Sequence, residues 1–424
     1  MRNFSYTSAV NTAILCRMKV AIVGQGYVGL TTAMGCLKAG HKVVGIEKNH
    51  KVIANLNEGV SHIEGISGEN ILSGIRTGSF RVTEEYSEVK DVNVVIIAVP
   101  TPLTSDGGPD LSILKSAVDS IAPHLTEDSL VISESTSYVG TLRDVVAKRI
   151  TEVNPKVKHF AISPERVDPG NSKFKIENTP RLVGGIDTES TQLAVNFYST
   201  FCTEVVTVSG PEVAEAAKLL ENSFRYVNIG FINEFAKIMH SMGIQVSEVI
   251  SAASTKPYGF MQFFPNIGIG GHCIPVDPFY LQKNAIEVGI PSRFIELTKI
   301  NNLEMFDYSI NCLERLYGSF KKKRILIVGV TYKPNISDTR ESPAEHVIQI
   351  LRSRGAKVDW HDPLVIEYMG ETSSSPSGNY DLALVLVKHN DLNLSDWQGG
   401  PIYCIRRIDS NKDWIPILDT EINQ

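Results

Sequence analysis

Cysteine in a glycine-rich loop is the feature of this sequence with the clearest capacity for covalent chemistry. Cys273 lies in the loop 268–278 (GIGGHCIPVDP), and Asp277 follows four residues later between two prolines. Glycines let a backbone approach a ligand closely, and thiolates become reactive in polar, partly exposed surroundings. The remaining cysteines lack the spacing of a zinc site and are expected to be reduced structural thiols, so no metal is predicted; they are Cys16, Cys36, Cys202, Cys312 and Cys404.

A thiolate is most useful to an oxidoreductase that carries an alcohol through the aldehyde to the acid. It attacks the aldehyde to give a thiohemiacetal, which can donate a hydride, and the resulting thioester is open to water. An enzyme that stops at a ketone needs no such nucleophile. Cys273 beside a dinucleotide-binding domain therefore predicts oxidation to a carboxylate, while a purely structural cysteine in a tight loop is the alternative.

A long helix is expected at 211–240, with Pro211 in its first turn. Lys218 could stabilise an alkoxide and a tetrahedral oxyanion, and Asn222 lies one turn further on the same face. The alternative is a solvated helix lysine, which is the commoner situation. The presence of Cys273 in the same sequence favours a catalytic role for Lys218.

Residues 24–29 (GQGYVG) fit the GxGxxG pattern of dinucleotide-binding proteins. The pattern follows an apolar strand at 18–23 and opens a helix at 27–39, which is the context that the pattern requires. The glycines serve the tight turn, the approach of the pyrophosphate and the packing of helix on strand, in the order Gly24, Gly26 and Gly29.

Glu47 ends the second expected strand, at 42–46, and predicts NAD as the cofactor. Its carboxylate can accept from both ribose hydroxyls and would repel a 2′-phosphate. Lys48 beside it could tolerate a phosphate, which leaves NADP open.

Two further strand ends lie where ligands bind in open α/β sheets. Pro100 and Thr101 follow a strand at 92–99, and Thr136 follows a strand at 130–133. Thr101 could bind the cofactor, although a rigid turn explains the neighbouring prolines equally well. Thr136 could bind cofactor or a reacting water, or simply cap a helix.

The order of elements indicates an α/β fold in three parts. An NAD-binding Rossmann domain is expected at 18–208, a central all-α region with the cysteine loop at 209–316, and a second Rossmann-like unit at 317–424. Residues 1–17 are expected to be a disordered extension.

Charge and hydropathy exclude other classes. The 424 residues include 41 basic and 47 acidic ones, a net charge of −6, so nothing favours nucleic acid or anionic membrane as a partner. No apolar stretch has the length of a membrane span. A cytoplasmic enzyme is expected.

Seven motifs, taken in order, carry a resemblance to a known family. They are GQGYVGL (24–30), AVPTPL (98–103), ESTSYVGT (134–141), SPERVDPGN (163–171), AEAAKLLENSFRYVNIGFINE (214–234), GGHCIPVDP (270–278) and GVTYKPNISDTRESP (329–343). Across residues 18–410 the chain resembles the UDP-glucose/UDP-N-acetylhexosamine 6-dehydrogenases.

The resemblance implies an NAD domain, a helical dimerisation region and a C-terminal UDP-binding domain, in a homodimer or larger homo-oligomer. It implies a four-electron oxidation of a UDP-sugar with two NAD. It assigns Cys273 as nucleophile, Lys218 and Asn222 as oxyanion stabilisers, and Asp277 as activator of the nucleophile or of the hydrolytic water. Thr136 and Glu165 would position water. The implied contacts with the cofactor add Tyr27, Val28 and Lys48. Those with the substrate are Glu165, Arg166, Lys218, Asn222, Arg225, Gly270, Lys333 and Arg340, and Arg340 could reach a neighbouring subunit's site.

GGHCIPVDP and SPERVDPGN resemble the N-acetylhexosamine branch, and the second resembles UDP-N-acetylglucosamine enzymes most. UDP-N-acetylmannosamine and UDP-glucose are the alternatives. The UDP-glucose enzymes carry a second acidic residue where this chain has Pro169, with Asp168 one position earlier, so no water-holding role is transferred there. Two other readings stay open: a two-electron hydroxyacid-type dehydrogenase, and a non-catalytic protein that binds NAD or UDP-sugar.

Overall fold

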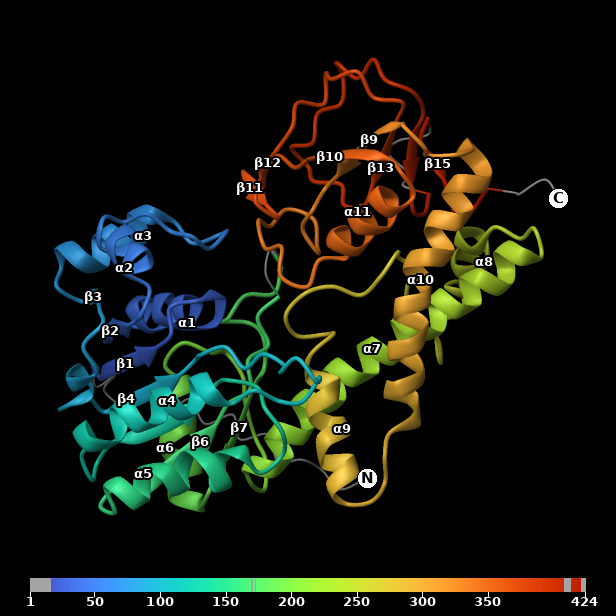
Figure 1. Ribbon diagram of the computed structural model, residues 1–424. Coiled ribbons are helices and arrows are strands. Elements are labelled where there is room, and N and C mark those ends of the chain that lie inside the picture. Colours follow the sequence, from blue (N-terminus) through green and yellow to red (C-terminus); the bar gives the residue numbers. More distant parts are fainter. Residues whose placement is uncertain (1–16, 169–170, 172, 408–412, 421–424) are drawn as a thin grey trace. The chain divides into compact units, whose positions relative to one another are not determined.

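The computed structural model describes residues 17–168, 171, 173–407 and 413–420 (Figure 1). The predicted disordered extension, apart from Arg17, and Pro169 lie outside the described residues. The chain divides into two compact units, Met1–Leu220 and Glu221–Gln424. The expected three-part division stays a prediction at the level of its boundaries.

Unit 1 is built on an eight-stranded sheet of order β3-β2-β1-β4-β5-β6-β7-β8. All its neighbours are parallel except β6 and β7, which are antiparallel. The sequence predicted five of these strands, the fifth from the apolar run at 159–162, and missed β3, β7 and β8, which are short or carry charged residues. The strands are β1 (Lys19–Val23), β2 (Lys42–Ile46), β3 (Phe80–Thr83), β4 (Val94–Ile97), β5 (Leu130–Ser133), β6 (His159–Ile162), β7 (Arg181–Gly185) and β8 (Val205–Thr207).

Helices cover both faces of this sheet, as the alternation of strands and helices predicts. Residues of α1, α3 and α6 share one buried apolar cluster with alternate strand residues such as Val20 and Ile22. Residues of α4 and α5 share the other with the intervening Ala21 and Val23. The helices are α1 (Tyr27–Lys38), α2 (His50–Asn57), α3 (Gly68–Arg76), α4 (Ser112–Ile121), α5 (Lys148–Val153) and α6 (Thr188–Tyr198), with shorter turns at Tyr86–Val89, Ala122–His124 and Leu142–Ala147.

The predicted long helix is confirmed as α7 (Pro211–Ser241), which runs across the boundary of the two units. The predicted helical region continues with α8 (Val246–Ala253), α9 (Asp277–Glu287) and α10 (Arg293–Tyr317), and the cysteine loop lies between α8 and α9. Among the described helices, none combines the length and apolarity needed to cross a membrane.

Unit 2 carries a five-stranded parallel sheet of order β10-β9-β13-β14-β15. Helices α10 and α11 (Pro343–Ser353) pack on one face. The other face packs against Tyr380, Trp414 and a loop that contains Leu392, Leu394 and Trp397. The strands are β9 (Arg324–Val328), β10 (Lys357–His361), β13 (Leu382–Val385), β14 (Ile402–Cys404) and β15 (Ile415–Pro416), with a small hairpin of β11 (Glu367–Tyr368) and β12 (Glu371–Thr372).

Candidate active site

The glycine loop of unit 1 has the geometry that dinucleotide binding requires. Gly24 has φ +93°, and a Cβ there would lie 2.4 Å from the carbonyl oxygen of Ala98. A Cβ at Gly29 would lie 1.9 Å from the carbonyl oxygen of Gly24. Around Gly26, in contrast, no heavy atom lies within 4 Å of that position, so the backbone is open to an approaching group. The three roles predicted for these glycines agree with this geometry.

The first turn of α1 is also suited to an anion. Gly26 is its N-cap and supplies no side-chain hydrogen bond to the first amides. Unpaired amides at a helix N-terminus carry a partial positive charge and bind phosphate. Tyr27 and Val28 form the start of this turn, so the loop fits the pyrophosphate of NAD.

Glu47 is held against the same loop. Its Oε2 accepts from the Gln25 amide at 2.9 Å, and its Oε1 accepts from the amides of Lys48 and Asn49 at 2.8 and 3.0 Å. A carboxylate has about four acceptor sites, so capacity for a ribose hydroxyl remains. The Lys48 ammonium lies 3.2 Å from the Ser116 hydroxyl.

The strand ends after β4 and β5 are tied together. The Thr101 hydroxyl donates to the carbonyl oxygen of Thr136 at 2.6 Å. This bond uses the hydroxyl proton of Thr101, so its remaining capacity toward a ligand is as an acceptor. Pro100 is exposed beside it.

Glu165 and Lys218 meet within unit 1. The Lys218 ammonium donates to the backbone carbonyl of Glu165 at 2.6 Å. The Glu165 side chain is buried, and burial raises the pKa of its carboxyl group, an effect that nearby Arg181 and Lys218 oppose. The adjacent Arg166 donates to the carbonyl of Pro180 at 2.9 Å.

In unit 2, the cysteine loop forms the entry to α9. The amide of Asp277 donates to the carbonyl of Cys273 at 2.8 Å, and Asn222 donates through Nδ2 to the buried Asp277 carboxylate. Cys273, Asp277 and Asn222, which were predicted to act together, therefore lie close to one another.

Cys273 also differs from the other described cysteines in exposure. It is partly exposed, whereas Cys36, Cys202, Cys312 and Cys404 are buried. Burial raises the pKa of each of these four thiols, to about 11 for Cys202 and about 12 for Cys404. Thiolates react and thiols do not, so the buried four are chemically quiet at neutral pH.

The neighbour of the cysteine, His272, joins a charged group. Its Nδ1 lies 3.5 Å from Asp338 Oδ2 and 3.0 Å from Arg340 Nη2. Despite desolvation, Asp338 and Cys273 raise the pKa of His272 to about 9, while Arg340 opposes the rise. Arg340 itself donates to both oxygens of Asp338, through Nε at 2.9 Å and Nη2 at 2.6 Å.

Two glycines bring the cysteine loop onto the loop after β9. A Cβ at Gly270 would lie 2.7 Å from Pro343 Cδ, and one at Gly271, which has φ +94°, would lie 2.9 Å from the Tyr332 ring. Only glycine permits this approach.

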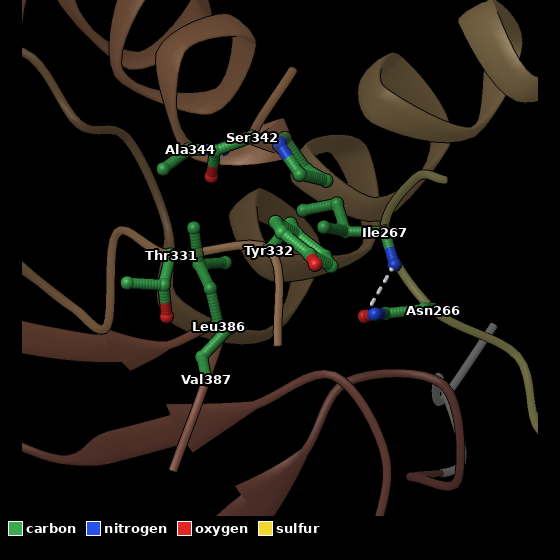
Figure 2. A pocket seen from close by; sticks show the side chains of 9 residues that line it. Asn266, Ile267, Thr331, Tyr332, Ser342, Ala344, Leu386 and Val387 are labelled. Atoms are coloured by element: carbon green, nitrogen blue, oxygen red, sulfur yellow. Dashed lines mark hydrogen bonds between the residues drawn. The ribbon is translucent and has the colours of Figure 1, made fainter. Parts of the chain in front are cut away.

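A small hollow opens beside this contact (Figure 2). Its volume is about 10 Å³, which is about the space that one water molecule needs. Its lining combines backbone and small polar groups with apolar ones: Asn266, Ile267, Thr331, Tyr332, Ser342, Pro343, Ala344, Leu386 and Val387.

Comparison with known families decides the identity of this arrangement. Sequence profiles of one family match the chain in three consecutive stretches: its NAD binding domain at residues 18–202, its central domain at 212–303 and its UDP binding domain at 326–402. The chain belongs to the UDP-glucose/GDP-mannose dehydrogenase family. It is an NAD-dependent nucleotide-sugar dehydrogenase.

Two relatives and one solved structure illustrate the likeness. A UDP-N-acetyl-D-mannosamine dehydrogenase from Pyrococcus horikoshii is 33% identical over 90% of this chain and 92% of its own length. A UDP-N-acetyl-D-glucosamine 6-dehydrogenase from Pseudomonas aeruginosa is 32% identical over 88% and 91%. The solved UDP-D-ManNAc dehydrogenase of P. horikoshii superimposes with a TM-score of 0.84 at 30% identity, covering 95% of this chain and 99% of that one.

The remaining residues predicted to contact the substrate are Arg225 and Lys333. Arg225 on α7 is exposed, and Lys333 is partly exposed in the loop between β9 and α11. Among the described residues, no three histidine, cysteine or acidic side chains gather as a metal ion would need.

Three residues with close polar contacts to the predicted site were not singled out from the sequence. Glu134 and Arg181 lie buried around Glu165, and Asp338 contacts His272. A signal for Arg181 existed, since it is a charged residue that opens an otherwise apolar strand.

Proposed function

We propose that this dehydrogenase oxidises the C6 alcohol of a UDP-N-acetylhexosamine to the uronic acid through a covalent intermediate on Cys273. The observation that carries the proposal is the partly exposed Cys273 in a loop that packs on the UDP-binding domain. In the same unit, Asp277 and Asn222 are hydrogen-bonded at the start of α9.

NAD, when bound at the glycine loop, accepts one hydride in each of two oxidations. Lys218 stabilises the alkoxide that forms as the alcohol loses its proton. The sulfur of Cys273 then bonds to the aldehyde carbon, and the thiohemiacetal formed is oxidised to a thioester. Water attacks the thioester carbon, the carbon–sulfur bond breaks and the cysteine is restored. Alcohol, two NAD and one water thus give carboxylate, two NADH and three protons.

The roles that we propose for the flanking residues are those that the family resemblance implies. Asn222 joins Lys218 in stabilising oxyanions. Asp277 activates the nucleophile or the hydrolytic water, and Thr136 and Glu165 position that water. Lys333 and Arg340 bind the nucleotide part. Arg166, Arg225 and Gly270 complete the substrate contacts.

For the sugar, we favour UDP-N-acetylglucosamine on the residues of SPERVDPGN. Relatives named for the mannosamine and glucosamine sugars are 33% and 32% identical to this chain, so overall similarity does not separate the two. UDP-N-acetylmannosamine is therefore the second candidate. The acid product would supply surface polysaccharide synthesis, from the cytoplasm.

We also propose a homodimer. In unit 2, α10 exposes an apolar row of Phe294, Leu297, Ile300 and Leu303, with exposures of 72%, 63%, 46% and 51%. Apolar rows of this kind mark association surfaces. Light scattering should give twice the chain mass, and Leu297→Glu should reduce it to one chain.

The deciding experiment is a panel of UDP-glucose, UDP-N-acetylglucosamine and UDP-N-acetylmannosamine, read by NADH formed per sugar consumed. Two NADH per sugar is expected with an N-acetylhexosamine. One would indicate a two-electron dehydrogenase, and none with any sugar would indicate a binding protein.

A further inference from the structure

A buried cluster of charged residues surrounds Glu165 in unit 1. Its members, which we call the carboxylate cluster, are Glu134, Glu165, Arg181 and Tyr198. Each is between 0% and 6% exposed. They come from four elements that meet at the end of β5: the residue after β5, the loop after β6, the start of β7 and the end of α6.

The contacts in the carboxylate cluster are unequal. The Arg181 guanidinium is ion-paired with Glu134 and lies 3.5 Å from Glu165 Oε1. Glu134 also accepts from the Tyr198 hydroxyl at 2.6 Å and from the Thr32 hydroxyl at 3.0 Å. Glu134 is thus well supplied with donors to its charged form.

Glu165 has weaker support for a negative charge. Its carboxylate accepts from the amide of Val167, and its other oxygen has the 3.5 Å contact with Arg181. Lys218 is a second cation, but its hydrogen bond goes to the Glu165 backbone carbonyl. One guanidinium therefore serves two buried carboxylates, and an uncompensated buried charge is costly.

The phenol and thiol groups that face the cluster are neutral near pH 7. Burial raises the pKa values of Tyr198, Cys36 and Cys202. Desolvation raises the pKa of Glu165, and the charge on Glu134 adds to the rise. The net charge of the cluster is thus decided between the two glutamates.

We propose that Glu134 and Arg181 are positioning residues for the oxidation, which together hold Glu165 beside Lys218 and make Glu165 the carboxylate that takes up and releases a proton during turnover. This inference rests on the proposed function. In thioester hydrolysis, the water oxygen bonds to the acyl carbon, Glu165 accepts the water proton, and sulfur leaves as the thiolate. The acyl group then departs as the carboxylic acid, which ionises in solvent.

The primary test is Glu134→Gln, which keeps the shape but leaves Arg181 to Glu165 alone. The acidic limb of the pH profile of kcat should move about 1 pH unit lower, because an unshared guanidinium favours the charged form of Glu165. Glu215→Gln is the matched control, another buried glutamate of unit 1, whose partners are the amides of Gly140 and Leu142. An unmoved limb in Glu134→Gln, or an equal movement in the control, overturns the proposal.

The double variant Glu134→Gln/Arg181→Met should move the limb in the opposite direction, to higher pH. If it does not fold, the single variant still decides. KM for the nucleotide sugar should change less than kcat in Glu134→Gln, as expected of a positioning role in the chemical step.

A substrate-free measurement separates this inference from the proposed function. Because the pKa of Glu165 is raised in the folded protein, the free energy of unfolding should fall as pH rises from about 4.3, the value for a free glutamate, through the raised value. Glu165→Gln should remove this part of the pH dependence, and Glu134→Gln should shorten its range. If no sugar is oxidised but this pattern is found, the cluster is as inferred and the proposed reaction is wrong. If sugars are oxidised and the pattern is absent, the inference alone fails.

Discussion

The first strands of the two sheets, β1 and β9, end in similar glycine turns, but the helices that follow these turns differ. After β1, Gly24 has φ +93° and would bring a Cβ within 2.4 Å of the carbonyl oxygen of Ala98. After β9, Gly329 has φ +81° and would bring a Cβ within 2.1 Å of the carbonyl oxygen of Val387. In each case the obstructing residue follows the neighbouring parallel strand. Close packing at the sheet edge, not ligand binding, therefore requires glycine at both positions.

An acidic residue after the second strand holds each turn. Glu47 accepts from the Gln25 amide at 2.9 Å, and Asp362 accepts from the Val330 amide at 2.8 Å. Asp362 is 3% exposed and lies 3.1 Å from His389 Nε2, whereas Glu47 is partly exposed. The same structural carboxylate is thus accessible to a ligand in unit 1 and inaccessible in unit 2.

The helices that follow differ at their first turn. The N-cap of α1 is Gly26, with no side-chain bond, whereas Ser342 caps α11 by accepting from the Ala344 amide at 3.2 Å. Pro343 removes a further donor from α11. The first turn of α1 therefore offers more backbone donors than that of α11, and we expect phosphate binding in unit 2 to depend more on side chains such as Lys333.

The largest effect on turnover is expected from substitution of Cys273, which should stop the reaction and leave the binding of both substrates intact. Cys273→Ser should lower acid formation at least ~10³-fold, because loss of a covalent nucleophile removes the path to the thioester. Binding of NAD and of the UDP-sugar, measured by calorimetry, should remain. Iodoacetamide should label Cys273 first in the wild-type protein, since the other described thiols are buried. Unchanged turnover in Cys273→Ser would contradict a covalent mechanism.

The second prediction tests side-chain binding of phosphate in unit 2. Lys333→Met should raise KM for the UDP-sugar by ~10- to 100-fold, as expected for loss of a charge-assisted hydrogen bond, and leave KM for NAD unchanged. Steady-state kinetics with each substrate varied in turn would measure both values.

The matched control is Lys321→Met, an exposed lysine of the same unit before β9. Both KM values should stay within twofold of wild type. A similar rise in the control, or a rise in KM for NAD in Lys333→Met, would remove Lys333 from the substrate site.

Much of this architecture could be predicted from sequence because it rests on local patterns. The runs at 42–46, 130–133 and 159–162 coincide with β2, β5 and β6, since strands buried on both faces are continuously apolar. Strand β7 escaped prediction because Leu182 and Val183 are its only large apolar residues, followed by two glycines. Its antiparallel pairing with β6 also departs from the expected parallel order, since pairing depends on tertiary contacts that no local pattern encodes.

The sequence indicated candidate site residues of reactive or polar type, but it did not indicate the buried residues around them. Cys273, Asn222 and Asp277 were found from residue type and spacing, and the structure brings them together. Glu134 and Arg181 are separated by 47 positions in sequence. Their ion pair depends on β5 and β7 ending in the same part of the fold, and no spacing along the chain indicates that.

A third prediction uses the accessibility of Glu47. Glu47→Ala should raise the NADP-to-NAD ratio of kcat/KM by ~10-fold, because the repulsion of a 2′-phosphate and the acceptor for the ribose hydroxyl are both lost. Glu47→Gln is the control for the turn, since its oxygen can still accept from the Gln25 amide. It should retain stability and show part of the change in cofactor preference. An unaltered ratio in both variants would exclude Glu47 from the ribose site.

The smallest effect on turnover is expected from substitution of Asp362, the buried acidic residue that occupies in unit 2 the position of Glu47 in unit 1. Asp362→Asn should leave kcat and both KM values within twofold of wild type and lower the free energy of unfolding by ~1–3 kcal/mol. The reason is that the carboxylate supports the Val330 amide and His389 in the interior. Asp359→Asn is the matched control, because its ion pair with Arg324 is exposed and should contribute at most ~1 kcal/mol.

The pH dependence of Asp362→Asn gives the sharper comparison. Hydrogen bonds from His389, Leu364 and Val330 lower the pKa of Asp362 in the folded protein against the cost of desolvation. Its stabilising contribution is therefore complete above about pH 4, the value for a free aspartate, and is lost as pH falls through the lower folded value. Denaturant unfolding at pH 7 and at pH 3 should show the difference between wild type and Asp362→Asn shrinking at the acidic pH. If the difference in unfolding free energy between wild type and Asp362→Asn did not depend on pH, the side chain of Asp362 would act by its shape and not by its charge. Glu47 and Asp362 would then share no electrostatic role.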